Sequence, residues 1–413
     1  MTHAQKLNNA VPAPRGLLVI LAHAFPPSPL IGGARPFRFY KYLPESGYAR
    51  QVITATEQNA AMPPDVQCVR DDTLDSRTGF AFQFERAARK FLLPGEEGIT
   101  WAHRATAAAW KIVQANAGIP VTIFSTFPPL GAHIAAFELA TRWGLPWIAD
   151  FRDPFAFDPS RSTKSYQKTF ARLLESAVFR FATAIIANTD AMAARWRQTY
   201  PHAAHKIHVI WNGYDPEDDL GPAPITPAPY KFISHVGELY GGRHPGAIIA
   251  SIDRLIAAGK ISAEQVRLRL MGPVDHATVL DSDSIRRALQ TGWLDISPKQ
   301  CPREQARDLA TRSDGLLLLQ PQSAVQVPGK LFEYVRIGRP ILALIARDSP
   351  VERILARSGI AHCSVHPDDP SNVVDEQIQL FLSLSNEAAA PSTWFCDEFN
   401  ARNQTAALCR LMY

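Results

Sequence analysis

The chain alternates regularly between short apolar runs of strand length and longer stretches with helical periodicity, and this alternation constrains its fold more than any other feature. Helical periodicity is clear in residues 132–143 and 167–181. Strands that alternate with helices are typical of βαβ units, which build a parallel sheet. The apolar runs of the first half predict strands at 17–21, 52–54, 121–124, 147–149, 184–187 and 207–210.

A second series of apolar runs begins after a proline-rich segment at 212–230. These runs predict strands at 232–236, 266–271, 316–319, 340–344 and 360–364. Since a domain usually has roughly 100–200 residues, a chain of 413 residues has room for two. We therefore predict an α/β protein with two doubly wound Rossmann-like domains. The expected divisions are a loose tail at 1–15, an N-terminal domain at 16–216, a linker at 217–230, a C-terminal domain at 231–390 and a last segment at 391–413.

The composition, with 46% hydrophobic and 20% charged residues, is that of a globular protein and excludes fibrous and disordered classes. Lys and Arg exceed Asp and Glu by seven in residues 1–216, whereas acidic residues exceed basic ones by three in the rest. A basic half suits an anionic surface or substrate, or simply scattered solvated charge. The five cysteines form no CxxC pair and have no zinc-type spacing with histidine. We therefore predict no disulfide framework, no metal site and a reducing, cytoplasmic location.

Two segments bear on membrane contact. The longest early apolar run, at 16–25, is too short to span a bilayer and is unlike a cleavable signal. Residues 79–93 place Arg86, Arg89 and Lys90 among four phenylalanines and two leucines. Such a basic amphipathic segment can lie on an anionic leaflet, although a helix with its phenylalanines in the core fits the pattern equally well. The hypothesis is peripheral contact at the inner face of a membrane.

Ligands of open α/β sheets bind beyond the carboxyl ends of the strands, so residues that follow the apolar runs are the candidates for function. After the first run, Gly32 and Gly33 precede a helix that begins near Arg35. Adjacent glycines allow an anion close to the backbone at a helix N-terminus, although a simple tight turn explains them too. Neither GxGxxG nor a P-loop is present, which argues against a nicotinamide enzyme and a nucleotide triphosphatase.

Four ionisable residues follow two neighbouring runs of the first half. His133 comes at the start of a helix, and Asp150, Arg152 and Asp153 follow the run at 147–149. A lone histidine at a helix start is more often a cap or a packing residue, but ionisable neighbours favour a functional site. These four residues are therefore candidate site residues.

The second half has two turns of the same kind. Gly237 follows the first strand expected there, and Arg243 lies six residues further on, before a helix. Lys330 lies in the first turn of a helix that Pro328 introduces, where a cation opposes the helix dipole unless an anion binds. Glu333, one turn further, can accept hydrogen bonds from two ribose hydroxyls or can cap the helix. Together these residues indicate a diphosphate site.

In these motifs the sequence resembles the nucleotide-sugar-dependent glycosyltransferases of family 4, which have the GT-B fold, and the likeness covers nearly the whole chain from about residue 16. The shared landmarks are FPP with GG and an arginine at 25–35, PP-x(3)-H at 128–133, PWIADFRDP at 146–154, WNGYD at 211–215, GELYGGR at 237–243 and VPGKLFEY at 327–334. Each landmark alone is common, whereas their order along the chain is specific.

The resemblance implies two Rossmann-like domains that face each other across a cleft, with a C-terminal helix at 394–412 that crosses back to the first domain. It implies a hexosyltransferase-type enzyme that moves a sugar from a nucleotide diphosphate donor, with retention, to a glycan, a lipid-linked acceptor or a small molecule. No metal, other cofactor or nucleic acid is expected.

The resemblance also implies a role for each candidate residue. Arg243 and Lys330 would neutralise the leaving diphosphate, Glu333 would bind the ribose, and Gly237 and Gly33 would contribute to donor binding. His133 would contact the sugar or the acceptor and counts, with Arg243 and Lys330, as catalytic. The acceptor side is expected to include Gly32, Arg35, Asp150, Arg152 and Asp153.

Two positions depart from the family pattern. Val325 stands where the family has the first of two glutamates, and Glu238 stands where an arginine is common. Two other functions stay open, and the missing first glutamate motivates the second of them. One is a nucleotide-sugar epimerase of the same architecture, and the other is a scaffold that keeps the fold without activity.

Overall fold

The computed structural model describes residues 13–28, 31–55, 62–71, 91, 98–157, 164–224, 227–239, 242–274, 282–299 and 301–412. The chain forms two compact units. The first comprises Met1–Arg152, Thr169–Ile186 and Thr405–Tyr413, and the second comprises Asp153–Lys168 and Ala187–Gln404. The domain boundaries expected at 216, 230 and 390 stay predictions.

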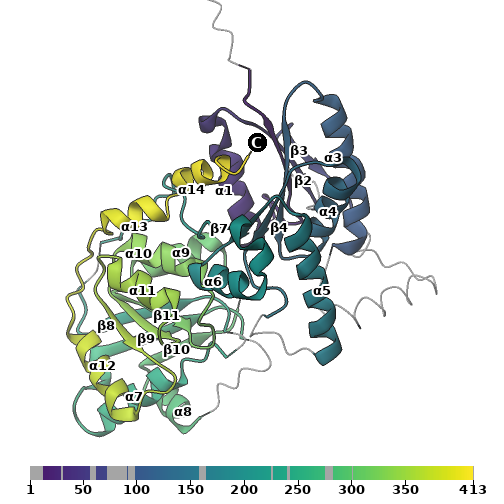
Figure 1. The fold of residues 1–413 in the computed structure, drawn as a ribbon. Helices are drawn as coiled ribbons and strands as arrows, with labels where there is room; N and C mark the ends of the chain where they lie inside the picture. The colour runs from purple at the N-terminus through teal and green to yellow at the C-terminus, as the bar shows by residue number, and fades with distance from the viewer. Residues whose placement is uncertain are drawn as a thin grey trace, which may run out of the picture. The chain divides into compact units, whose positions relative to one another are not determined.

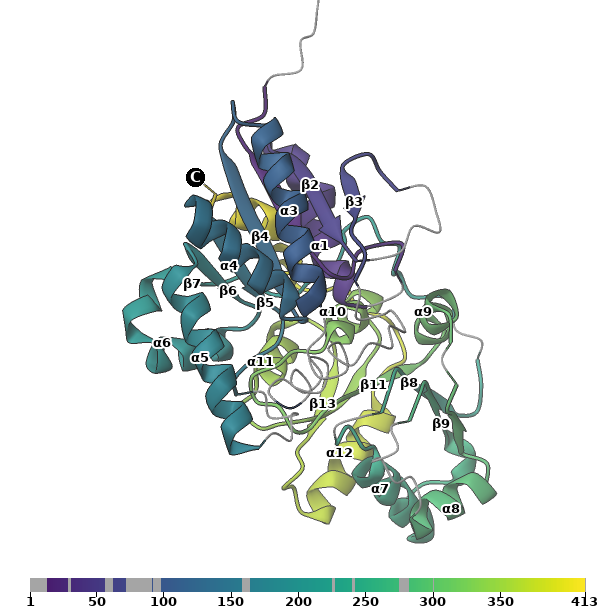
Figure 2. The same ribbon diagram turned by 90° about the vertical axis from the view of Figure 1, so that its right-hand side faces the viewer.

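The first sheet has seven strands in the order β3-β2-β1-β4-β5-β6-β7 (Figure 2). Its strands are β1 (Leu17–Leu21), β2 (Ala49–Thr54), β3 (Val66–Cys68), β4 (Val121–Phe127), β5 (Trp147–Phe151), β6 (Ala184–Ala187) and β7 (Ile207–Val209). The helices between them are α1 (Ala34–Tyr42), α3 (Ile99–Ala115), α4 (Gly131–Trp143), α5 (Ser165–Phe181) and α6 (Asp190–Thr199). In β1, Leu17 pairs with both Ala49 and Val121, and all five residues of the strand are buried.

Different helices cover the two faces of the first sheet. The chain crosses from β1 to β2 through α1 in one direction along the sheet, and from β3 to β4 through α3 and from β4 to β5 through α4 in the other. Since parallel crossovers are right-handed, α1 covers one face while α3 and α4 cover the other. Figure 2 shows α3 and α4 side by side, and the two helices are in contact.

The second sheet has six strands in the order β10-β9-β8-β11-β12-β13. Its strands are β8 (Lys231–Val236), β9 (Val266–Met271), β10 (Leu294–Ser297), β11 (Gly315–Gln320), β12 (Ile341–Ile345) and β13 (His362–Val365). The helices that follow β8 to β13 are α7 (Gly246–Ala257), α8 (Asp283–Gln290), α9 (Arg303–Thr311), α10 (Gly329–Ile337), α11 (Pro350–Arg357) and α12 (Ser371–Ser383). The chain ends with α13 (Thr393–Glu398) and α14 (Ala401–Cys409) (Figure 1).

Alternate residues of the second sheet pack into two hydrophobic clusters. Leu317 and Leu319 of β11 belong to the cluster that contains residues of α7, α8 and α12. Leu316 and Leu318 belong to the cluster that contains residues of α10, α11 and α13. Side chains alternate between the faces of a strand, so a strand covered on both faces needs apolar residues throughout. This requirement explains the continuous apolar runs in the sequence.

The predicted fold class is confirmed, because both sheets are parallel and carry helices on both faces. Every apolar run named above forms a strand, and the strand ends differ from the prediction by at most three residues. The sequence does not predict β3 and β10, which are only three and four residues long. Such short strands lack the run of alternating or apolar residues that marks the others.

The helix expected at 394–412 is divided into α13 and α14, as Figure 1 shows. Between them, Tyr214 N donates to Phe399 O at 3.0 Å, and Ala401 N donates to Tyr214 O at 3.1 Å. The main chain at 399–401 therefore pairs with Tyr214 instead of continuing the helix. Gly213 permits this approach, since a Cβ atom there would lie 2.1 Å from Phe399 O. The WNGYD motif thus docks the C-terminal segment.

We predict that Gly213→Ala destabilises the protein, because the added methyl group would collide with the main chain at Phe399. Overpacking of this kind costs about 2 kcal/mol, which corresponds to a melting temperature roughly 4–8 °C lower. Thermal unfolding followed by circular dichroism measures the change. Gly118→Ala is the control, because a Cβ atom at Gly118 would meet nothing within 4 Å. Equal melting temperatures for the two variants would contradict the docking role of Gly213.

Candidate functional site

Gly237 and Lys330 lie together at the carboxyl edge of the second sheet. Gly237 directly follows β8, and Lys330 is the second residue of α10. A Cβ atom on Gly237 would lie 1.3 Å from Lys330 Nζ, so the ammonium occupies the space that any other side chain would fill. Gly237 also has a φ of +145°, which favours glycine. The structure therefore brings together two residues that the sequence predicts for one site.

Lys330 is a cation that burial has separated from much of its water. Burial lowers the pKa of Lys330 to about 8; the charge of Glu333 raises this pKa, and that of Arg243 lowers it. Within the described residues, no carboxylate forms an ion pair with the ammonium. A buried charge is costly unless a ligand or partner compensates for its lost hydration. The position of Lys330 therefore suits an anionic ligand such as a diphosphate.

Arg243 and Glu333 add charge around Lys330. Arg243 lies in the turn before α7, and its charge lowers the pKa of both Lys330 and His235. Glu333 lies one turn into α10, with its carboxylate 3.5 Å from a guanidinium nitrogen of Arg303. Among the described residues no main-chain amide donates to its carboxylate, so Glu333 does not cap the helix. The carboxylate remains half-exposed and can accept hydrogen bonds from hydroxyl groups.

His235, two residues before Gly237, is a site residue that the sequence analysis does not include. Its Nδ1 is 2.9 Å from the carbonyl oxygen of Leu317, which can only accept, so Nδ1 carries a hydrogen. Burial lowers the pKa of His235 to about 3, and the charge of Lys330 lowers it further, so the ring is neutral. Among the described residues, its buried Nε2 has no partner. The sequence feature that could have identified His235 is its spacing of two residues from Gly237, which places both residues on the same face of the strand.

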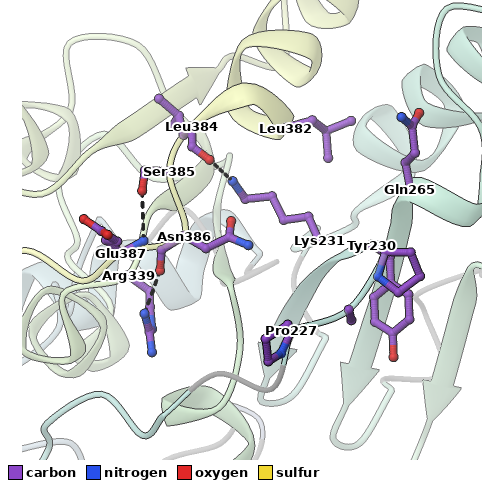
Figure 3. A pocket seen from close by; sticks show the side chains of 12 residues that line it. Pro227, Tyr230, Lys231, Gln265, Arg339, Leu382, Leu384, Ser385, Asn386 and Glu387 are labelled. Atoms are coloured by element: carbon purple, nitrogen blue, oxygen red, sulfur yellow. Dashed lines mark hydrogen bonds between the residues drawn. The ribbon is translucent and has the colours of Figure 1, made fainter.

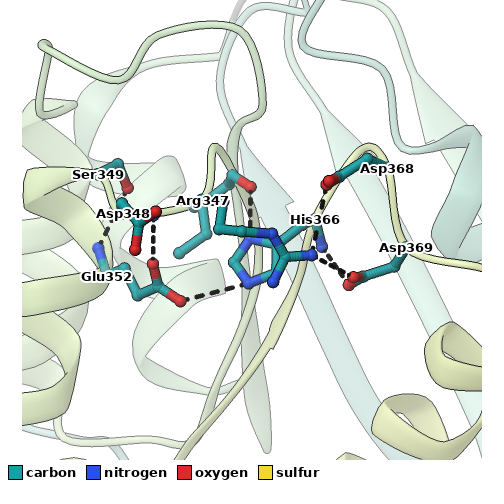
Figure 4. A network of polar contacts seen from close by, with 8 residues as sticks. Arg347, Asp348, Ser349, Glu352, His366, Asp368 and Asp369 are labelled. Atoms are coloured by element: carbon teal, nitrogen blue, oxygen red, sulfur yellow. Dashed lines mark hydrogen bonds and ion pairs between the residues drawn. The ribbon is translucent and has the colours of Figure 1, made fainter.

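A polar network fixes the loops that follow β12 and β13 at the same edge (Figure 4). His366 Nδ1 donates to Ile345 O at 3.1 Å, and its Nε2 lies 3.3 Å from Glu352 Oε1. The other oxygen of Glu352 accepts a hydrogen bond from Asp348 N at 2.7 Å. Asp348 has a φ of +55°, a conformation uncommon for residues other than glycine. Glu352 therefore holds the turn after β12 in a strained shape.

A hollow of about 750 Å³ lies at the opposite, amino-terminal edge of the second sheet (Figure 3). Lys231 donates from Nζ to Leu384 O at 2.6 Å, and Arg339 donates from Nη1 to Asn386 O at 2.6 Å. Burial lowers the pKa of Lys231 to about 8, although the charge of Asp314 raises it. Both cations thus hold main-chain oxygens of the segment after α12. Because the hollow lies away from the carboxyl ends of the strands, it does not belong to the candidate site.

His133 is enclosed in the first unit, with 1% of its surface exposed. Its Nδ1 is 2.7 Å from Ser125 Oγ, which accepts a hydrogen bond from Trp147 Nε1 at 2.7 Å. Burial lowers the pKa of His133 to about 3, and the charge of Arg152 lowers it further. The ring is therefore neutral, and its buried Nε2 has no partner in the described part of the chain. A contact of His133 with sugar or acceptor stays a prediction.

Arg35 and Asp150 form a buried ion pair between α1 and the end of β5. Arg35 Nη2 donates to Asp150 Oδ1 at 2.8 Å, and Thr126 Oγ1 donates to Asp150 Oδ2 at 2.8 Å. The structure brings these two predicted residues together, where each binds the other. Asp153 belongs to the second unit, where its Oδ1 accepts a hydrogen bond from Gln326 Nε2 at 2.9 Å. Acceptor contacts by these residues stay a prediction.

The two adjacent glycines after β1 pack closely against the chain itself. A Cβ atom on Gly32 would lie 2.6 Å from a guanidinium nitrogen of Arg152, and one on Gly33 would lie 3.1 Å from Phe25 Cα. Arg152 in turn donates from Nε to Phe127 O at 3.2 Å. The tight-turn interpretation of the glycines therefore has structural support, and their contact with a ligand stays a prediction.

Several expectations concern membrane contact, metal binding, the basic segment and the glycine-rich turn. In the described part of the chain, no helix is long and apolar enough to cross a bilayer. The same residues contain no group of three His, Cys, Asp or Glu side chains that could hold a metal ion. The basic residues Arg86, Arg89 and Lys90 lie outside the described residues, as do Tyr240 and Gly241 of the glycine-rich turn.

Residues 36–218 match the family model of Glycosyltransferase Family 4. No curated protein matches the chain in sequence. Among solved structures, sucrose-phosphate synthase from Thermosynechococcus elongatus is similar, with 14% identity and a TM-score of 0.61 over 96% of this chain and 95% of that chain. HepE from Anabaena, in complex with UDP and glucose, has 14% identity and a TM-score of 0.58 over 96% of this chain and 98% of its own.

A third similar structure is a protein assigned as a UDP-N-acetylglucosamine 2-epimerase from Listeria monocytogenes. It has 8% identity and a TM-score of 0.52, over 96% of this chain and 95% of that chain. At such low identities the likeness shows a common fold and leaves the choice between transfer and epimerisation to the site.

We predict that Lys330→Met raises the stability of the protein at pH 7 by on the order of 2 kcal/mol, because it removes a buried charge. The pKa of Lys330 falls from 10.5 to about 8 on folding, so the folded state releases the proton first as pH rises. The destabilisation that comes from burying the charged ammonium is complete below pH 8 and decreases between pH 8 and 10.5. The gain should therefore shrink as pH rises.

Melting temperatures at pH 7 and pH 9.5 check this prediction, with the exposed Lys299 changed to Met as the matched control. Lys330→Met should melt higher than the wild type at pH 7 and differ less at pH 9.5. A lower melting temperature at pH 7 would show that Lys330 stabilises the fold and would contradict a charge held for a ligand.

Proposed function

Because residues 36–218 match the model of Glycosyltransferase Family 4 and the chain has the fold of the similar structures, we propose that it transfers a sugar from a nucleotide diphosphate donor to an acceptor. One observation carries the proposal: the ammonium of Lys330 lies over Gly237, at the edge of the sheet where parallel α/β proteins bind ligands. Structures of the same fold in complex with UDP and UDP-glucose make a UDP-sugar the first donor to test.

The main chemical difficulty in this reaction is the departure of the diphosphate. As the bond from the anomeric carbon to the diphosphate oxygen breaks, negative charge grows on that oxygen. Preorganised cations stabilise this charge more in the transition state than in the bound donor. Lys330 and Arg243 are the cations in this proposal, and the half-exposed carboxylate of Glu333 accepts hydrogen bonds from the ribose hydroxyls. The reaction then needs no metal ion.

The finer features of the proposal follow from the family resemblance. They are transfer of a hexose, retention of the anomeric configuration, and an acceptor that is a glycan, a lipid-linked sugar or a small molecule. The proposed location, which rests on the cysteine pattern, is the cytoplasm, and the proposed pathway class is polysaccharide synthesis. Proton NMR of the first product formed distinguishes retention from inversion, because the two anomers differ in the coupling of their anomeric protons.

We predict that Lys330→Met and Arg243→Ala each lower turnover of the UDP-sugar by on the order of 10²-fold or more, because each removes charge that stabilises the leaving group. Glu333→Gln should instead raise the KM for the donor with little change in kcat, since a ribose contact exists in the ground and transition states alike. Release of UDP measures both effects, with Lys299→Met as the control. Near-wild-type turnover in both cation variants would contradict the diphosphate site.

The same experiment separates the two other functions, the epimerase and the inactive scaffold. An epimerase would convert the nucleotide sugar or its sugar into an isomer, which chromatography of the products reveals. A scaffold would bind UDP but would neither hydrolyse nor transfer any sugar. A new glycosidic bond in the product supports the transferase.

We also propose that the basic segment at 79–93 binds anionic membranes peripherally, which would suit a lipid-linked acceptor. The wild type should float with vesicles that contain phosphatidylglycerol and should stay in solution with phosphatidylcholine vesicles. High salt and the triple change of Arg86, Arg89 and Lys90 to alanine should abolish flotation, since both remove the electrostatic attraction. Equal behaviour with both kinds of vesicle would exclude this contact.

A further inference from the structure

Two buried cations line the hollow at the amino-terminal edge of the second sheet, which the candidate site does not use (Figure 3). Lys231 is the first residue of β8, and Arg339 lies two residues before β12. Only 6% of Lys231 and 5% of Arg339 is exposed. In the described part of the chain, neither cation forms an ion pair with a carboxylate. Because a buried charge is costly unless a partner compensates for its lost hydration, this wall of the hollow favours an anion.

Each cation spends only part of its hydrogen-bonding capacity on the protein. An ammonium has three N–H donors, and Lys231 gives one of them to Leu384 O at 2.6 Å. A guanidinium has five, and Arg339 donates to Asn386 O at 2.6 Å and to Ala223 O at 2.7 Å. The buried Nε of Arg339 has no partner among the described residues. Main-chain oxygens carry no net charge, so both cations keep charge and donors for an oxyanion.

One buried carboxylate acts on these cations, and it compensates for only part of their charge. Asp314 accepts a hydrogen bond from Phe232 N at 2.7 Å through its Oδ2. Burial lowers the pKa of Lys231 to about 8 and also lowers the pKa of Arg339, while the charge of Asp314 raises both. Lys231 therefore stays mostly charged at pH 7. Two cations against one carboxylate leave this wall with an excess of positive charge.

The rest of the lining suits a small polar molecule better than a bare ion. Tyr230 and Ser385 contribute hydroxyl groups, and Gln265 and Asn386 contribute amides. Such groups exchange hydrogen bonds with the hydroxyls of a ligand. The volume of about 750 Å³ lies within the range of small-molecule sites, and a single phosphate ion would leave most of it empty. The hollow therefore has room for a hydroxyl-bearing body attached to an anionic group.

We propose that this hollow is a second ligand site, which binds a small organic phosphate through Lys231 and Arg339. A phosphate group offers several strong acceptor oxygens, which match the unused N–H donors of an ammonium and a guanidinium. The hydroxyl-bearing body of the ligand lies against the polar side chains of the lining. The site is distinct from that of Lys330, because it lies at the opposite edge of the same sheet. It therefore does not depend on the proposed transfer reaction.

A purely structural role, in which the cations only fasten the segment after α12, would explain the same main-chain contacts. Two variants separate the roles, because they change the charge beside the hollow and leave both cations in place. Glu387→Gln removes a negative charge from the lining, and Asn386→Asp adds one. Asn386 O accepts from Arg339, and Glu387 N donates to Ser385 Oγ at 3.1 Å, so these contacts use main-chain atoms of the changed residues. Neither variant therefore removes a contact that fastens the segment.

Calorimetry of the full chain at pH 7 measures the Kd for ribose 5-phosphate, for ribose as its uncharged counterpart and for inorganic phosphate. Ribose 5-phosphate should bind more tightly than either of the other probes. Lys231→Met and Arg339→Lys should each weaken its binding about tenfold, since each removes charge-assisted hydrogen bonds. Glu387→Gln should tighten binding and Asn386→Asp should weaken it, each about twofold. Lys299→Met and Glu376→Gln, which change exposed residues outside the lining, are the matched controls.

The outcomes also separate this site from the donor site. Lys330→Met should weaken the binding of UDP and leave that of ribose 5-phosphate unchanged, whereas loss of ribose 5-phosphate in this variant overturns the second site. So does the absence of saturable binding, or an equal affinity for ribose or inorganic phosphate. If the cation variants fail to fold, Glu387→Gln and Asn386→Asp still decide, because unchanged affinity in both is the result of a structural role. Failure of the wild type to bind UDP contradicts the donor site alone.

Discussion

The ammonium of Lys330 is the one charge on which the site of the second unit depends. It lies over Gly237, in space that any other side chain would fill, and burial lowers its pKa to about 8. Proteins seldom keep a charge with so little compensation unless a ligand supplies the rest. The glycine after β8, the cation of Arg243 and the half-exposed carboxylate of Glu333 are all consistent with an anionic, hydroxyl-bearing ligand at this edge.

Close approach of main-chain segments is the second constraint, and glycine makes it possible in both units. A Cβ atom on Gly272 would lie 2.5 Å from Gly237 O, and one on Gly131 would lie 2.0 Å from Gly98 O. Gly213 in the same way admits the carbonyl of Phe399. Several glycines in the motifs thus serve main-chain packing at the sheet edge.

Three histidines near the sheet edges show how surroundings decide the chemistry of one side-chain type. His133 and His235 are enclosed, and burial holds the pKa of each near 3, so both rings are neutral. His23 differs because a carboxylate oxygen of Asp71 lies 2.7 Å from its Nε2. Apolar burial opposes a proton on the rings of His133 and His235. Of the three, His23 is the one whose ring hydrogen-bonds to a carboxylate.

The sequence by itself determined the two parallel α/β sheets and nearly all of their strands, and it predicted that Gly237, Lys330 and Glu333 belong to one site. These features depend on local apolar runs and on turns at strand ends, which are written in neighbouring residues. Only the tertiary structure decided that Arg35 binds Asp150, 115 residues away, and that His23 binds Asp71, 48 residues away. It also decided that Phe399 leaves its helix to pair with Tyr214. Such contacts depend on where the fold places distant segments and on which charges lose their water there, and neither is encoded in a local pattern.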